Sequence, residues 1–110
     1  MIEEIIQNYL RENAFPCYLS VPEKPSGNFC VLEKTGSSYK DGIFTATLAV
    51  QSYGSSDHAA AQLSHRVVQT MLDADTLPEI VSCTLNTDYN FPDTTRKLPR
   101  YQAVFEVAHY

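Results

Sequence analysis

The sequence has little glycine, no tryptophan and no long apolar run. Its 4 glycines are isolated and form neither of the glycine-rich patterns that bind phosphate groups, so we interpret them as turn residues. The apolar runs are only a few residues long, whereas a helix needs roughly 20 to cross a bilayer. Met1 leads into the acidic segment Ile2-Glu3-Glu4-Ile5, which lacks the basic and apolar regions of a signal peptide. We therefore expect a protein without membrane association that is kept inside the cell.

Basic residues and paired cysteines are also scarce. The chain has 8 Lys and Arg against 13 Asp and Glu, a formal net charge of −5. Because non-specific affinity for nucleic acid comes from Lys and Arg, this balance opposes a protein whose main work is neutralising phosphates. Cys17, Cys30 and Cys83 are odd in number and far apart, with no zinc-site spacing. They are expected to be buried, reduced thiols.

The chain has enough apolar residues, at 44%, to bury one core, and its 110 residues favour a single domain over residues 1–110. Hydrophobic spacing predicts two amphipathic helices and four main strands. The helices are expected over 2–10 and 57–72, and the strands over 29–34, 43–53, 80–89 and 101–110. Turn-forming residues fill 23–28 and a hairpin loop over 35–42, and a long polar connection spans 90–99.

This order of elements predicts the α+β class, with a mostly antiparallel sheet of about four main strands and two helices packed on one face. In the strand over 43–53, apolar Phe44, Ala46, Leu48 and Val50 alternate with smaller or polar residues, which is typical of a sheet covered on one side. The same alternation predicts the apolar faces of the last two strands: Val81, Cys83 and Leu85, and Tyr101, Ala103, Phe105 and Val107. Sequential strands usually pair, so the first two strands and the last two are each expected to form a hairpin.

The residues offer no constellation for catalysis. A K-T-G and an S-x-x-K overlap the same loop at 34–40, but their order is wrong for penicillin-binding enzymes and the chain is too short for that fold. His58 and His65 lie two helical turns apart, too far to share a metal ion, and His109 lies near the end of the last strand. Asp73 and Asp75 are interpreted as a solvated turn. We expect no enzyme activity, no catalytic residue, no cofactor and no metal.

Basic residues gather at one place. Arg96, Lys97 and Arg100 lie in the connection between the last two strands, beside the aromatic Tyr89 and Phe91. Such a loop is either a solvated hairpin tip or a contact for nucleic acid or an acidic partner. Since an acidic protein facing an acidic partner needs a basic contact point, we favour protein contact.

A second pair of candidate contacts, Tyr39 and Lys40, lies in the other predicted hairpin loop. The candidate protein contacts are therefore Arg96, Lys97, Arg100, Tyr39 and Lys40, chosen for their charge and expected exposure.

The layout of the elements, rather than a motif, carries a resemblance to a family. An amphipathic helix over 2–10 precedes a long strand over 44–53, which runs through Gly54-Ser55-Ser56 into an alanine-rich helix with Leu63, Val67 and Met71. A strand over 101–107 completes the pattern. This layout resembles the tail terminator (tail completion) and related neck proteins of long-tailed bacteriophages and prophages.

The resemblance implies an α+β subunit that assembles with copies of itself as a hexameric ring at the head-proximal end of the tail tube. The ring would stop tube polymerisation and dock to the head–tail connector proteins, while DNA passes through its lumen without sequence recognition. The implied partners are therefore the chain itself, the tail tube protein and the connector. The implied location is the bacterial host cytoplasm during assembly and the tail or neck of the virion afterwards. No functional residue is carried over, because the family has no short signature to match.

Other classes of function remain open from the sequence. One is a small ligand-binding or regulatory α+β domain without catalytic activity, which needs a pocket with convergent polar groups. Another is a different neck or head-closure component. A nucleic-acid-binding module would need a basic face, and only the loop around Arg96 qualifies.

Overall fold

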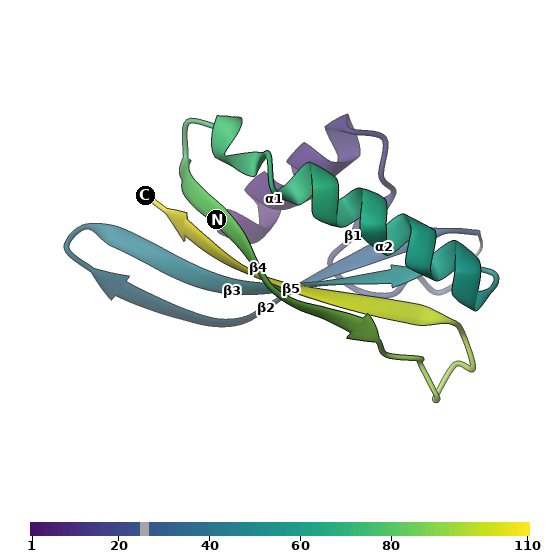
Figure 1. Cartoon of the computed structure of the whole chain (residues 1–110). Helices are drawn as coiled ribbons and strands as arrows, with labels where there is room; N and C mark the ends of the chain where they lie inside the picture. The colour runs from purple at the N-terminus through teal and green to yellow at the C-terminus, as the bar shows by residue number, and fades with distance from the viewer. Residues whose placement is uncertain (25–26) are drawn as a thin grey trace.

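A computed structural model shows the fold over residues 1–24 and 27–110, and it confirms the α+β class. The turn expected over 23–28 falls partly on residues 25 and 26, which lie outside the described residues. The described residues form two α-helices, one short 3-10 helix and five strands (Figure 1). In chain order they are α1 (Ile2–Glu12), β1 (Cys17–Tyr18), β2 (Phe29–Lys40), β3 (Ile43–Tyr53), α2 (Asp57–Met71), the short 3-10 helix η1 (Ala74–Thr76), β4 (Ile80–Asn90) and β5 (Arg100–His109).

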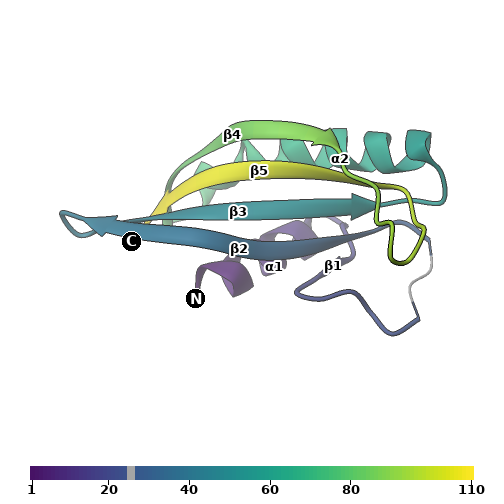
Figure 2. The same cartoon turned by 90° about the horizontal axis from the view of Figure 1, so that it is seen from below.

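The strands form one sheet in the order β1-β2-β3-β5-β4. The two-residue β1 is parallel to β2, and every other pairing is antiparallel. Both expected hairpins are present, β2 with β3 and β4 with β5, and β3 joins them by pairing with β5 at the centre. Both helices cover one face of the sheet (Figures 1 and 2). On the opposite face a smaller cluster is buried at one end, made of Phe29, Val31 and Tyr53, with Val21 and Leu98 packed against it.

The core lies between the helices and the covered face. Leu48 and Val50 of β3 and Phe105 of β5 are completely buried, as their alternation predicts. From the helices, Ile6 of α1 and Val67 of α2 are completely buried against them. No helix in the described part of the chain is long and apolar enough to span a membrane.

The first hairpin is longer than the sequence pattern predicted. The strand expected to stop at residue 34 continues to Lys40, and the turn consists only of Asp41 and Gly42. Both turn residues have positive φ, 53° and 84°, as a tight two-residue hairpin turn requires, and Asp-Gly is a favoured pair for it. The strand continues through a bulge between Lys34 and Gly36, where Thr35 has no pairing partner on β3 and Gly36 pairs with Thr47. Tyr39 therefore lies at the end of a strand, and the predicted loop over 35–42 is wrong.

Bulges also shift which side chains are buried. The register changes between Ile80 and Ser82, so Ile80 is buried and Val81 is 40% exposed, although the alternation predicted Val81 in the apolar face. Phe44 of β3 is likewise 42% exposed. Its direction is the predicted one, in phase with Ala46, but it lies where the hairpin extends beyond the helices (Figure 1).

The connection from β3 to α2 depends on a close approach at Gly54. A β-carbon on this residue would lie 2.5 Å from the Ala60 nitrogen and 2.9 Å from the Ala59 carbonyl carbon. Ala60 is completely buried, so the alanine-rich first turns of α2 seat the helix against the end of β3. Helix and strand can meet this closely only because position 54 has no side chain.

We predict that Gly54→Ala lowers the free energy of unfolding by about 1–3 kcal/mol, because the added methyl group collides with backbone that cannot yield without moving α2. The matched control is Gly36→Ala, since a β-carbon there meets nothing within 4 Å and the backbone is not in the left-handed region. Urea unfolding followed by circular dichroism measures both variants. Equal stability of the two variants would contradict the close approach.

Candidate interaction surfaces

An exposed aromatic cluster lies at the projecting end of the β2–β3 hairpin. The ring centroids of Tyr39 and Phe44 are 4.7 Å apart, and Phe44 stacks on His109 at 5.4 Å with an interplanar angle of 13°. Tyr39 is 62% exposed. Cross-strand pairing positions the three rings, because Tyr39 pairs with Phe44 and Phe44 pairs with His109. We call Tyr39, Phe44 and His109 the hairpin patch.

The hairpin patch has the composition of a contact surface. Aromatic side chains give large contact area at low entropic cost and are enriched where proteins bind one another. The sequence-predicted contact Lys40 is also exposed, and it pairs with Ile43 next to the patch. The sequence reasoning selected Tyr39 and Lys40 but missed Phe44, because the alternation assigned Phe44 to the core.

The connection between β4 and β5 is folded around a buried carboxylate. Asp93 is only 4% exposed, and its Oδ1 accepts hydrogen bonds of 3.1 Å from the backbone amides of Thr95 and Arg96. Its Oδ2 accepts a 2.9 Å hydrogen bond from the Tyr53 hydroxyl. Backbone hydrogen bonds between Asp93 and Leu98 close the loop. The predicted long polar connection is therefore an ordered loop.

The three predicted basic contacts have different surroundings in this loop. The Arg96 guanidinium lies 3.1 Å from Asp93 Oδ2 with its side chain 48% exposed. Arg100 is the first residue of β5, and its side chain is only 14% exposed. It donates a 2.7 Å hydrogen bond to the Phe91 carbonyl, and its guanidinium lies 4.4 Å from the centroid of the Phe91 ring. Lys97 is exposed at a positive φ of 56° and forms no ion pair within residues 1–24 and 27–110.

The structure thus brings Arg96 and Arg100 together around Asp93, and Lys97 is the base of the three that is exposed without an ion pair among the described residues. Sequence reasoning missed Asp93 itself. Its signal was the Asp-Thr-Thr segment, because an aspartate readily accepts hydrogen bonds from the amides two and three residues later.

These contacts lower the pKa of Asp93. Burial alone would raise the pKa. Four contacts lower it by more than this: hydrogen bonds from the Arg96 backbone amide, the Tyr53 hydroxyl and the Arg96 guanidinium, and the charge of Arg100. A carboxylate with a lowered pKa stabilises the fold above the pKa of the unfolded state, and this contribution is lost as pH falls through the folded-state pKa.

We predict that Asp93→Asn destabilises the protein by about 1–3 kcal/mol at pH 7, because charge-assisted hydrogen bonds in a buried site are lost. The difference from the parent protein should shrink as pH falls below about 4, where this carboxyl becomes protonated in the unfolded chain, and should go on shrinking through the lower pKa of the folded state. Urea unfolding at pH 7 and pH 3 measures it, with the exposed Asp88→Asn as control. The same destabilisation at both pH values would show that the charge of Asp93 contributes nothing.

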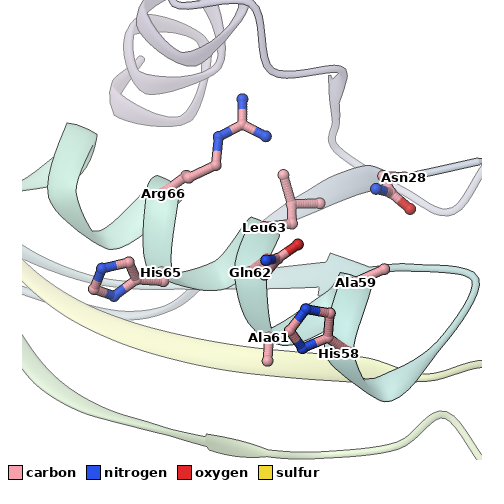
Figure 3. A pocket seen from close by; sticks show the side chains of 8 residues that line it. All are labelled: Asn28, His58, Ala59, Ala61, Gln62, Leu63, His65 and Arg66. Atoms are coloured by element: carbon pink, nitrogen blue, oxygen red, sulfur yellow. The ribbon is translucent and has the colours of Figure 1, made fainter.

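A surface groove follows α2 beside the start of β2. Its volume is about 490 Å³, and Figure 3 shows the side chains that line it. The polar groups at the groove include Asn28, His58, Gln62 and Arg66, and none of the described residues that line it carries a carboxylate. The Arg66 guanidinium also lies 5.3 Å from the centroid of the Phe15 ring. A groove with these donors suits an anionic ligand better than a cation.

The remaining titratable groups are not gathered into a site. His58 and His65 are exposed on α2, and no group of three or more His, Cys, Asp or Glu side chains in the described part of the chain is close enough to hold a metal ion. Cys17, Cys30 and Cys83 are buried and unbonded, as predicted. Burial raises the pKa of Cys17 to about 11 and the pKa of Cys30 and Cys83 to about 12, which keeps all three as thiols at neutral pH.

No protein-family model matches this sequence, and no curated protein matches it. The surfaces and their positions in the fold are therefore the features that indicate a function. The hairpin patch and the loop around Asp93 lie at opposite ends of β3, since Phe44 pairs with His109 at one end and Tyr53 with Arg100 at the other. The longest dimension of the molecule is 43 Å, and Figure 2 shows the hairpin and this loop at its two ends.

Proposed function

We propose that this chain is a structural protein of phage or prophage assembly, a subunit of a ring that terminates the tail tube and joins it to the head connector. The observation that carries the proposal is the separation of two exposed contact surfaces along one elongated sheet. The hairpin patch is aromatic and the opposite loop presents Lys97, so the two ends suit different partners. A subunit that joins two structures needs such an arrangement.

Each end is assigned to a partner by its chemistry. The hairpin patch, with its exposed rings, contacts the tail tube protein, where apolar contact area gives durable binding. The loop with Lys97 contacts an acidic surface of the head connector, because an acidic protein approaches another acidic protein through its basic points. The net charge of −5 leaves most of the surface unattractive to DNA, which suits a lumen through which DNA must slide.

The mechanism in this proposal is assembly. Copies of the chain bind at the end of the tube and occupy the surface on which the next tube ring would add. No bond is made or broken, so the proposal requires no cofactor and no metal. The subunit would act in the cytoplasm of a bacterial host during assembly and remain in the tail or neck of the virion.

We predict that the purified chain, added to the tail tube protein of the same phage or prophage, stops tube growth and forms a ring at one tube end. The variant Tyr39→Ser/Phe44→Ser should lose this capping and remain folded, because both side chains are exposed. The control Leu19→Ser/Leu72→Ser removes two exposed apolar side chains elsewhere and should cap normally. Negative-stain electron microscopy of tube lengths and ends gives the result.

Unrestrained tube growth in the presence of the parent protein would overturn the proposed function. Normal capping by the Tyr39→Ser/Phe44→Ser variant would instead remove the hairpin patch from the contact with the tube.

We predict further that Lys97→Ala weakens head joining and leaves the free energy of unfolding within about 0.5 kcal/mol of the parent protein, because Lys97 is exposed and outside the Asp93 network. Joining of capped tails to heads, counted by electron microscopy, is the measurement. The matched control is Lys24→Ala, another exposed lysine. Equal joining by the two variants would exclude the loop as the connector contact.

A second candidate function is a ligand-binding or regulatory domain without catalytic activity, and the α2 groove is the observation that favours it. Arg66, Gln62 and Asn28 there offer hydrogen-bond donors to a carboxylate or phosphate ligand. A different neck or head-closure role also fits two opposed contact ends. The tube experiment separates these candidates, because only a terminator stops tube growth.

A further inference from the structure

The sheet has an open edge on each side. The short β1 covers only Cys30 and Val31 of β2, and every residue from Glu33 to Lys40 is exposed. Among the described residues no strand pairs with the outer side of this segment, or with the outer side of β4 along Ile80–Asn90. We call these the β2 edge and the β4 edge. Open edges of this kind are templates for a strand from another chain.

The directions of the two edge strands are complementary. Successive antiparallel pairings of β2, β3, β5 and β4 make β2 and β4 run in opposite directions. Two copies placed side by side in the same orientation therefore set β4 of one antiparallel to β2 of the next. This pairing continues the antiparallel pattern that the sheet already has, and antiparallel pairing is slightly more stable per residue than parallel pairing.

The charges of the two edges are also complementary. The sequence from 67 to 95 contains no Lys or Arg, and it places Asp88 in β4 and Glu79 just before it. The β2 edge carries Lys34, Lys40 and the acid Glu33, and Lys34 lies 3.9 Å from the Glu3 carboxylate of α1. Lys40 is therefore the base of this edge that has no ion pair among the described residues. Pairing of two β4 edges would bring like charges together, whereas β4 against β2 brings unlike charges together, and unlike pairs across strands are the stabilising ones.

Each edge strand contains a bulge but keeps a regular segment that can pair with another strand. The register shifts lie between Lys34 and Gly36 in β2 and between Leu85 and Thr87 in β4. Residues 36–40 and 82–85 remain regular and free of proline, which leaves pairing segments on both strands. Because a bulge bends a strand and increases its twist, the joined sheets curve, which suits a closed assembly better than a flat stack.

We propose that the β2 edge of one copy of this chain pairs with the β4 edge of the next copy, so that copies join side by side into a closed ring. The inference rests on the proposed function, since it supplies the lateral contact of that ring. It uses the sides of the sheet, whereas the contacts with the tube and the connector use its two ends. A contact between two different surfaces closes into a ring when the rotation from copy to copy closes.

Charge reversal of each edge tests the pairing. The variant Ser38→Glu/Lys40→Glu makes the β2 edge acidic, and Thr84→Lys/Asp88→Lys makes the β4 edge basic; all four positions are exposed. Light scattering after size-exclusion chromatography should show one discrete oligomer for the parent protein. Each variant should lose it and elute at the monomer mass of 12.3 kDa. The control Glu12→Lys reverses an exposed charge on α1 and should keep the oligomer.

Recombining the reversed edges distinguishes this arrangement from symmetric pairing. The chain that carries all four substitutions should regain the oligomer, and so should an equimolar mixture of the two variants, because unlike edges face each other again. If β4 paired with β4, the four-substitution chain would stay monomeric, since two basic edges would face each other. That result, or an oligomer that persists in either variant, would overturn the proposal.

The outcomes also separate the inference from the proposed function. A parent protein that is monomeric at its highest soluble concentration but still caps tail tubes would overturn the edge pairing and leave the proposed function intact. A parent oligomer that follows the expected pattern of charge reversal but does not cap tubes would support the edge pairing and overturn the tail-terminator role.

Discussion

The antiparallel pairing of β3 with β5 is the interaction on which the rest of the structure depends. It joins two hairpins that are far apart in the sequence, with a register that runs from Phe44 opposite His109 to Tyr53 opposite Arg100. Both strands contribute completely buried side chains, Leu48 and Val50 from β3 and Phe105 from β5. Because β3 and β5 are paired on both sides, β2 and β4 lie outside them, with the two-residue β1 beyond part of β2.

The same pairing positions the two ends of the molecule. At one end it brings His109 onto Phe44 and completes the hairpin patch, and at the other it brings Arg100 to Tyr53 and the Asp93 loop. The helices cover one face of the sheet but leave the end of the first hairpin uncovered (Figure 1). The distinctive chemistry of the chain thus lies at the two ends of the sheet, where contact with other molecules is possible.

The basic residues show how tertiary structure changes the meaning of a local pattern. Arg96, Lys97 and Arg100 look equivalent in the sequence, but Asp93 holds the first in place, Phe91 and Tyr53 enclose the last, and only Lys97 faces solvent without an ion pair among the described residues. Two of the three charges therefore maintain the shape of the loop. The lowered pKa of Asp93 follows from the same contacts. The sequence shows only that three basic residues lie close together. The fold shows that two of them, Arg96 and Arg100, are held by contacts within the protein.

The sequence by itself determined the fold class, both hairpin pairings, most core residues of β3 and the buried, reduced cysteines. These follow from local patterns, because hydrophobic alternation shows which face of a strand is buried and the spacing of the cysteines excludes a zinc site. The incorrect predictions lie at bulges. Gly36 and the two serines after it were predicted to form a loop, and Val81 was predicted to be buried. A bulge inserts one extra residue into a strand and so changes which side chains face the core, which alternation does not reveal. The tertiary structure alone decided that β3 pairs with β5, that Phe44 remains exposed, that Asp93 is buried and that both outer strands have open edges. Each of these depends on contacts between residues distant in the sequence, and no local pattern encodes which distant strand becomes the neighbour.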